Sequence, residues 1–365
     1  MSNFIYLDNA ATTPICEAAK KVILEHINDF GNPSSNHELG RQARVLIEDA
    51  RERIAKCINA EPDEIYFTSG GSEANTWVLD NYTSISASFE HHSIKTNYGS
   101  VWVKPNGFVE PQSFILIGHP LSRLFELASC MYVNNEIGTI QPIKEIANVV
   151  HSKNMLFHTD AVQAVGHIPI DVKDLNCDML SASAHKFGGL KGIGFLYIKN
   201  GTKVKSLING GKQEQGLRGR TENVLGIISM AAALEDSVVH MEERNKHIVY
   251  LRDSLLDKIL QIPGYHLNGS LENRVPSNIN IRFDGVSGAR LVTMCSLYGI
   301  YISSGSACNE GISEPSHVLK AIGLTDEEAL SSVRITISHT NTEQEIDQAA
   351  DIITKLVERI RIDNG

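Results

Sequence analysis

A lysine set among small residues is the first side chain in this sequence that could carry chemistry. Lys186 lies in the segment SASAHKFGG at 181–189, directly after a predicted buried strand. Burial lowers the pKa of a lysine, and an amine that has lost its proton can form a Schiff base with an aldehyde. Lys186 therefore fits an anchor for an aldehyde cofactor, although taken alone it would be a surface lysine at a strand end.

An aspartate ends another predicted strand, in the segment FHTDAVQ at 157–163. Ligands gather at the carboxyl ends of strands in an open α/β sheet, so we expect Asp160 and Lys186 to face one pocket. A carboxylate beside a pyridine nitrogen keeps that nitrogen protonated, and the protonated ring is the electron sink of pyridoxal chemistry. By itself, Asp160 would be interpreted as a helix cap.

A third polar segment, TSGGSEAN at 68–75, joins a predicted strand to a predicted helix. Backbone amides and hydroxyls at a helix N-terminus bind anions, which suits the phosphate of such a cofactor. A glycine-containing turn of this kind is weak evidence alone, because it is also typical of a plain connecting loop.

Predicted strands and helices alternate from residue 15 to about 200, which is typical of a mainly parallel sheet covered by helices on both faces. The predicted strands are 64–68, 84–88, 114–117, 130–133, 155–158, 178–181 and 194–198. The predicted helices of this region are 16–27, 39–58 and 143–151.

The C-terminal third has a different pattern. A long helix is predicted at 222–260, strands at 278–283 and 332–337, and a last helix at 342–360. We therefore expect an α/β fold with a large domain at 13–245 and a smaller α+β domain formed by 1–12 and 246–365. Because the sequence shows no repeat and no low-complexity linker, the two domains are expected to pack closely.

Composition excludes several classes of protein. The formal net charge is -10, and Lys and Arg form no cluster, so direct nucleic-acid binding is not expected. The cysteines at 16, 57, 130, 177, 295 and 308 form no CxxC pair, so no metal site is expected. No secretory signal is visible, and the apolar run at 223–234 is too short to cross a bilayer about 30 Å thick. Scattered cysteines fit a reducing cytoplasm.

Segments spread over nearly the whole chain resemble cysteine desulfurases of the class V aminotransferase family, and they occur in that family's order. They are YLDNAATTP at 6–14, GNPSS at 31–35, FTSG at 67–70, VNNEIG at 133–138, the Asp160 and Lys186 segments, SSGSAC at 303–308 and VRIT at 333–336. The resemblance implies a fold type I enzyme that depends on pyridoxal 5'-phosphate, with a seven-stranded, mainly parallel sheet in its large domain.

The resemblance also implies a role for individual residues. Lys186 would be the Schiff-base lysine, Asp160 the partner of the pyridine nitrogen, and Gln163 a hydrogen-bond donor to the ring hydroxyl. His91 would stack on the ring and carry protons, although alone it would be an ordinary partly buried histidine. The remaining cofactor contacts would be Asn135 and, around the phosphate, Gly71, Ser72, Ser183, His185 and Thr221.

By the same resemblance, Thr221 would reach the active site of the neighbouring subunit in a homodimer. Arg334 would bind the carboxylate of the substrate L-cysteine through its two-pronged guanidinium, with Asn32 in support. The products would be L-alanine and a persulfide on Cys308, whose sulfur passes to acceptor proteins.

Cys308 distinguishes sulfur transfer from transamination. Its small, polar neighbours at 303–306 are typical of an exposed, mobile segment, from which a thiolate could reach both the pocket and an acceptor. The alternative is an idle loop cysteine. The segment at 309–319 resembles group I of the family, the iron–sulfur-cluster and nitrogen-fixation type.

Four features depart from the family pattern: a short 73–134 region, Leu190, Arg220 and His339. The short region favours a dedicated acceptor pathway, such as tRNA thiolation or DNA phosphorothioation, over general iron–sulfur cluster assembly. Two other functions stay open. A selenocysteine lyase or another class V aminotransferase would use the same lysine and aspartate, but transamination has no use for Cys308. A catalytically weak sulfur carrier or scaffold subunit would need none of the catalytic set.

Overall fold

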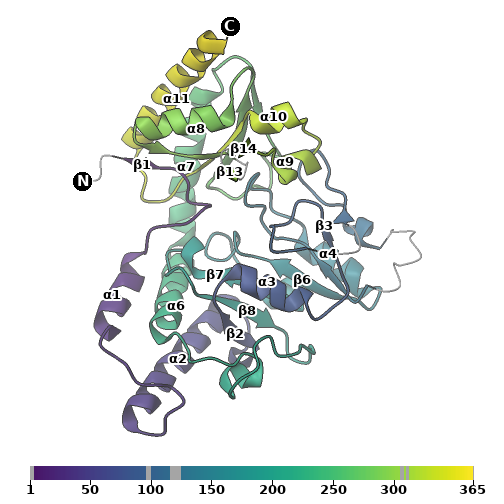
Figure 1. Ribbon diagram of the computed structural model, residues 1–365, viewed down its shortest axis with the longest axis vertical. Coiled ribbons are helices and arrows are strands. Elements are labelled where there is room, and N and C mark those ends of the chain that lie inside the picture. The colour runs from purple at the N-terminus through teal and green to yellow at the C-terminus, as the bar shows by residue number, and fades with distance from the viewer. Residues whose placement is uncertain (1–3, 96–99, 116–124, 305–307, 310–311, 365) are drawn as a thin grey trace.

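The computed structural model describes residues 4–95, 100–115, 125–304, 308–309 and 312–364, and only the backbone at 308–309, 312–313 and 364. The chain forms a large α/β lobe and a smaller lobe stacked on it (Figure 1). The α/β fold predicted from the sequence is confirmed.

A seven-stranded sheet forms the centre of the large lobe, in the order β2-β8-β7-β6-β5-β3-β4. Its strands are β2 Ile65–Thr68, β3 Ser84–Ala87, β4 Ser100–Val101, β5 Leu127–Ser129, β6 Leu156–Asp160, β7 Met179–Ser183 and β8 Gly194–Ile198. Only β8 runs antiparallel to its neighbours, so the sheet is mainly parallel, as predicted.

Alternate residues of each strand point to opposite faces of this sheet. Because apolar side chains lie on both faces, helices cover both of them. In β8, Phe195 packs into the core cluster beneath α2, α4 and α6, whereas Leu196 packs with Trp77 of α3. The helices of the large lobe are α1 Glu17–His26, α2 Glu38–Cys57, α3 Gly71–Leu79, α4 Ile143–His151, α5 Val172–Leu175 and α6 Val224–Val239.

The small lobe is built on a four-stranded antiparallel sheet in the order β12-β15-β10-β9. Its strands are β9 Tyr265–Leu267, β10 Asn278–Phe283, β12 Ser303–Ser304 and β15 Ser332–Thr336. Two further pairs are β1 Ile5–Tyr6 with β11 Ile300–Tyr301, and β13 Cys308–Asn309 with β14 Ile312–Ser313. The helices are α7 Met241–Ile259, α8 Gly288–Leu297, α9 His317–Ala321, α10 Asp326–Leu330 and α11 Glu343–Asn364.

The expected domain boundaries stay predictions, but the core clusters bear on them. Ile5 and Leu7 pack in the cluster of the small lobe. Val318 and Leu319 of α9 pack instead in the cluster of the large lobe. Helix α9, which follows Cys308 in the chain, therefore packs on the large lobe, although it lies in the C-terminal third of the sequence.

Three predicted elements were wrong in detail. Residues 111–114 form a 3-10 helix that begins at Pro111, so no strand begins at residue 114, and the rest of that predicted strand lies outside the described residues. The strand predicted at 130–133 is β5, Leu127–Ser129, because a continuous apolar run does not fix where a strand ends.

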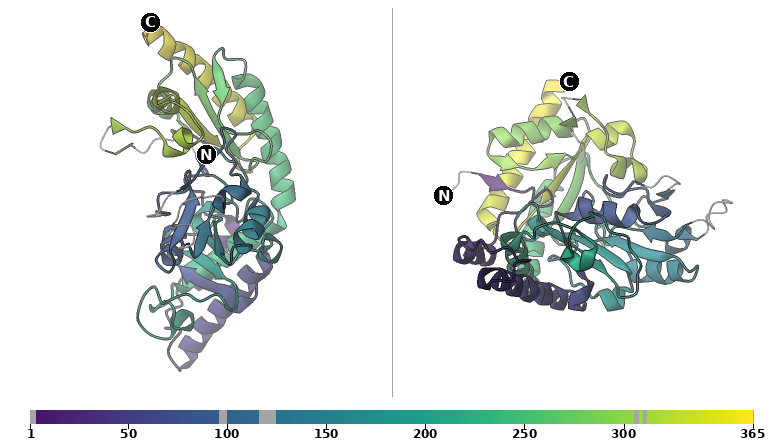
Figure 2. Two further views of the ribbon diagram at one scale, coloured as in Figure 1. Left: turned by 90° about the vertical axis from the view of Figure 1, so that its right-hand side faces the viewer. Right: turned by 60° about the horizontal axis from the view of Figure 1, so that its bottom comes forward.

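The long helix predicted at 222–260 is two helices, α6 and α7, which meet at His240 with a bend of 70°. From this bend α7 leads into the small lobe (Figure 2). Among the described helices, none is by itself both long and apolar enough to span a membrane, and only α6 and α7 taken together as a bent pair reach that length and composition.

Candidate active site

The carboxyl ends of two adjacent parallel strands bring together the first residues of the site. Asp160 is the last residue of β6 and Ser183 the last of β7. Lys186 ends the 3-10 turn that follows β7. The two strands are paired in register, with Asp160 opposite Ser181, so these ends lie at one edge of the sheet.

These residues line one cavity of ≈ 350 Å³, and residues from both lobes complete its wall. Arg334 comes from β15 of the small lobe, and the N-terminal segment contributes Ala10 and Ala11. The expected site residues in this wall are Gly71, Ser72, His91, Asn135, Asp160, Gln163, Ser183, His185, Lys186 and Arg334. A pocket of this size takes a substituted ring with a phosphate.

The amine of Lys186 is held by two backbone carbonyls of the N-terminal segment. Its Nζ donates to the carbonyl oxygen of Ala10 at 2.6 Å and to that of Ala11 at 2.8 Å. Burial and the positive charge of Arg334 together lower the pKa of Lys186 to about 8, although the negative charge of Asp160 acts in the opposite direction. A larger share of this amine is therefore unprotonated near neutral pH than for a free lysine, as a Schiff-base nucleophile requires.

Asp160 is buried and oriented by a side chain of α3. Its Oδ2 accepts a hydrogen bond from Nδ2 of Asn75 at 2.7 Å, and its Oδ1 accepts one from the amide of Val162 at 3.0 Å. His91 lies at the accessible mouth of the cavity, where its Nδ1 is 2.8 Å from Oγ of Ser93. Partial burial lowers the pKa of His91. The ring is therefore mostly neutral near pH 7 and can accept a proton.

Arg334 joins the small lobe to the cavity through two contacts. Its Nη2 donates to Oδ1 of Asp8 at 2.7 Å, and its Nη1 donates to the carbonyl oxygen of Asn135 at 3.0 Å. The buried Nε of Arg334 has no protein partner among the described residues. Ser303 lies opposite Arg334 in the β12–β15 pair, so the strand that precedes Cys308 in the chain pairs with the strand that carries Arg334.

The opposite end of the cavity fits a phosphate. Gly71 and Ser72 begin α3, and the free amides of a first helical turn can bind an anion such as a phosphate. A Cβ added at Gly71 would lie 2.5 Å from Cγ2 of Val162, so glycine is needed for the backbone to reach the cavity wall. Burial, with the charges of Lys186 and Lys191 acting the same way, lowers the pKa of His185 to about 4, so this ring is neutral near pH 7 and its one N–H can donate a hydrogen bond to a phosphate.

Three expected site residues are not placed in the cavity by the structure. Thr221 is exposed just before α6, and Asn32 is exposed with its Oδ1 accepting from the amide of Ser34 at 2.9 Å. Neither residue lines the cavity. Cys308 lies in β13, but its side chain is outside the described residues, so its expected role stays a prediction.

Sequence reasoning missed several residues that build the site. It gave no role to Asn75, which orients Asp160, or to Asp8, which holds Arg334. Asp8 belongs to the N-terminal segment that carries the family resemblance, which was the only signal for it. Asn75 lies one helical turn after Gly71, so its place on the inner face of α3 could have been derived from helical periodicity.

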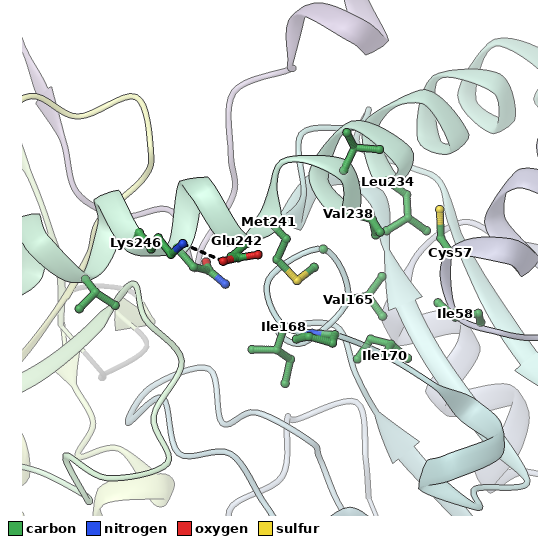
Figure 3. Close-up of a pocket in the computed structure, with 15 residues that line it drawn as sticks. Cys57, Ile58, Val165, Ile168, Ile170, Leu234, Val238, Met241, Glu242 and Lys246 are labelled. Carbon is green, nitrogen blue, oxygen red and sulfur yellow. Dashed lines mark hydrogen bonds and ion pairs between the residues drawn. The ribbon is translucent and has the colours of Figure 1, made fainter.

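A larger cavity of ≈ 850 Å³ lies elsewhere, between the end of α2, the α6–α7 junction and residues 165–170 (Figure 3). Its wall is mainly apolar, with Val165, Ile170 and Leu234, and the exposed pair of Glu242 and Lys246 lies at one side. None of the expected site residues lines it, so it is separate from the active site.

A buried carboxyl group next to His91 leads to a testable pH dependence. Oε1 of Glu90 accepts from the amide of Met131 at 2.8 Å, while its buried Oε2 has no protein partner among the described residues. Burial raises the pKa of Glu90 well above its ordinary value, and the negative charge of Asp160 raises it further. The folded protein therefore binds this proton more tightly than the unfolded chain does.

A carboxyl group whose pKa is raised by folding contributes its full stabilisation at pH values below its pKa in the unfolded chain. That stabilisation is lost as the pH rises. The Gln side chain of Glu90→Gln cannot ionise. We therefore expect the difference in Tm, variant minus wild type, to increase by about 2 °C or more between about pH 5 and pH 8. Thermal unfolding over that range measures the effect. The exposed Glu358→Gln should show no such trend, and a constant or falling difference for Glu90→Gln would contradict the account.

Comparisons with known proteins agree with this geometry. The model of the class V aminotransferase family matches residues 5–349. The curated relative "Cysteine desulfurase IscS" of Methanosarcina thermophila is 39% identical over 376 residues, covering 98% of this chain and 93% of the relative. The protein of the same name from Clostridium botulinum (strain Hall) is 41% identical over 387 residues, covering 99% and 96%.

Solved structures give the same result. A structure described as "NIFS-LIKE PROTEIN" superposes with a TM-score of 0.89 at 34% identity, covering 98% of this chain and 100% of that one. A structure described as "SspA in complex with cysteine" superposes with a TM-score of 0.79 at 32% identity, covering 92% and 99%.

Proposed function

Because the chain belongs to the class V aminotransferase family and is a cysteine desulfurase, we propose that it stores the sulfur of L-cysteine as a persulfide on Cys308. The observation that carries the proposal is the single cavity in which Lys186, Asp160, His91 and Arg334 meet. These side chains come from both lobes, and each suits one part of a pyridoxal-type reaction.

Enzymes of this family depend on pyridoxal 5'-phosphate, and the cavity fits that cofactor. Lys186 would bind its aldehyde carbon, Asp160 its ring nitrogen and Gln163 its ring hydroxyl. The phosphate would be held at the N-terminus of α3 by Gly71, Ser72, Ser183 and His185. When bound, the cofactor supplies an electron sink that makes the α-proton of the amino acid acidic.

The chain's own residues orient the substrate and move its protons. The two-pronged guanidinium of Arg334 suits the carboxylate of L-cysteine, and its contacts with Asp8 and Asn135 fix the plane of that fork. The lowered pKa of Lys186 suits an amine that takes the α-proton and returns it. His91, at the mouth of the cavity, is suited to exchange a proton with the leaving sulfur.

Sulfur transfer then needs a nucleophile that attacks sulfur. The Cys308 thiolate forms an S–S bond with the substrate sulfur while the Cβ–S bond breaks, and the electron pair stays with the carbon fragment. Protonation of that fragment gives L-alanine. Overall, L-cysteine and one thiol yield L-alanine and one persulfide, so no external oxidant is required. An acceptor protein with its own thiol would then remove the sulfur, for iron–sulfur cluster assembly, tRNA thiolation or DNA phosphorothioation.

A homodimer is part of the proposal. Thr221 is exposed and lies outside the cavity of its own chain, which suits a contact with the cofactor phosphate of the neighbouring subunit. Large apolar side chains are also exposed around α1 and the start of α2, including Leu24 at 72% and Phe30 at 83%. Covering such side chains favours association of two subunits.

The direct test is incubation of the purified protein, reconstituted with pyridoxal 5'-phosphate, with L-cysteine and a thiol reductant. We expect alanine and sulfide in equal amounts, together with a change in the visible spectrum of the bound cofactor. L-Serine, which has a hydroxyl in place of the thiol, is the matched control and should give neither product. A protein that binds the cofactor but forms no alanine from L-cysteine would overturn the proposal.

A further inference from the structure

Cys308 lies in the segment between β12 and α9, residues 305–316, which we call the Cys308 segment. This segment is attached to a different lobe at each end. Before it, β12 pairs with β15 in the sheet of the small lobe. After it, α9 buries Val318 and Leu319 in the core cluster of the large lobe. Figure 1 shows α9 at the border between the two lobes. Whatever holds α9 in place therefore fixes one end of the Cys308 segment.

Ser316 makes the first polar contact at this end. It is the N-cap of α9, and its Oγ accepts from the amides of Val318 at 3.1 Å and Leu319 at 3.3 Å. The same hydroxyl donates to Oε2 of Glu136 at 2.6 Å, and both residues are buried. Burial raises the pKa of Glu136 to about 7, and a hydrogen bond in a site removed from water is stronger than one exposed to solvent.

Glu136 is in turn fixed beside the active site. Its carbonyl oxygen accepts from Nδ2 of Asn278 at 3.0 Å and from Nδ2 of Asn280 at 3.1 Å. Its chain neighbour Asn135 lines the cavity and accepts from Arg334. The contact between Ser316 and Glu136 thus ties the start of α9 to the backbone that presents Asn135.

His317 makes the second polar contact. Its Nε2 donates to the carbonyl oxygen of Glu90 at 2.8 Å, which requires the tautomer with a proton on that nitrogen. Its ring packs against His92, with ring centroids 4.4 Å apart. Glu90 and His92 flank His91, so this contact ties α9 to the backbone that presents His91.

We propose that Ser316 and His317 are positioning residues that fix the C-terminal end of the Cys308 segment beside His91 and Asn135. This inference rests on the proposed role of Cys308. The two contacts reach the chain neighbours of two residues in the cavity wall, so they set the point at which the segment that carries Cys308 ends. Removing either contact changes that starting point without changing a residue that binds the cofactor or the substrate.

The test separates substrate binding from sulfur transfer. For Ser316→Ala and His317→Phe, we expect the single-turnover rate of alanine formation at saturating L-cysteine to fall roughly tenfold or more, because misplacement of about 1 Å can cost 10²-fold. L-cysteine affinity, measured by titrating the visible spectrum of the cofactor, should stay within about twofold of wild type, since affinity is set by the cavity. Ser316→Thr keeps the hydroxyl and should restore most of the rate.

Thr325→Ala is the matched control. Thr325 caps the next short helix, α10, in the same way but is exposed, so its loss tests capping alone. An equal rate loss in Thr325→Ala, wild-type rates in both test variants, or a parallel loss of L-cysteine affinity would overturn the inference. If Ser316→Ala does not fold, the rate of His317→Phe decides. Failure of the proposed function is distinguishable, because wild type would then form no persulfide.

Discussion

Lys186→Ala is expected to lose nearly all alanine formation from L-cysteine. The variant lacks both the amine that binds the cofactor aldehyde and the base that moves the α-proton, and the base alone is worth roughly 10²–10⁴-fold in rate. Nζ is held between the carbonyl oxygens of Ala10 and Ala11, and the described residues that line the cavity include no second lysine. Alanine release and the visible spectrum of the reconstituted protein measure the two effects.

Lys355→Ala is the control for this prediction, because Lys355 is exposed on α11 of the small lobe and does not line the cavity. It should leave both alanine release and the cofactor spectrum unchanged. Adding a small primary amine to Lys186→Ala should restore part of the rate if the missing group is the base. Wild-type alanine formation in Lys186→Ala would mean that this residue is not the anchor of the cofactor.

Cys308→Ala is expected to bind cofactor and L-cysteine normally but to release no sulfide and to form no persulfide. The reason is chemical: the cavity binds and activates the amino acid, but among its lining residues there is no cysteine to receive sulfur. The loss should therefore be close to complete for sulfur transfer, while the change in the cofactor spectrum on adding L-cysteine is retained. Sulfide release and that spectral change are measured on the same sample.

Cys57→Ser provides the matched control for a cysteine away from the site. Cys57 lines the large apolar cavity of Figure 3, and burial raises the pKa of its thiol to about 11, so it is not a thiolate near neutral pH. Its replacement should leave sulfide release unchanged. Sulfide release by Cys308→Ala at the wild-type rate would show that another thiol, or none, receives the sulfur.

Most of the fold and the centre of the site followed from the sequence for physical reasons. Apolar runs alternating with amphipathic helices specify a parallel sheet, and ligands then gather at the carboxyl ends of its strands. Asp160 and Lys186 were predicted to share a pocket on this argument, and both line one cavity. The positions of β5 and of the α6–α7 bend were less predictable, because a continuous apolar run sets no boundary.

The residues that the sequence did not indicate are those whose role depends on a contact between distant segments. Asp8 holds Arg334, and Ser316 binds Glu136 across 180 positions of the chain. The pKa of Glu90 is raised chiefly because the fold removes its carboxyl group from water. No local pattern encodes such contacts. The family resemblance pointed to the N-terminal segment that contains Asp8, but it gave that residue no role.

In the proposed reaction, Lys186 and Cys308 act on the same molecule of L-cysteine. One turnover with L-cysteine, followed by alkylation, digestion and peptide mass spectrometry, shows whether they do. We expect one added sulfur atom on the Cys308 peptide of wild type, matched by one alanine, and no added sulfur on that peptide in Lys186→Ala. Alanine formed without sulfur on Cys308, or sulfur found on a different cysteine, would contradict it.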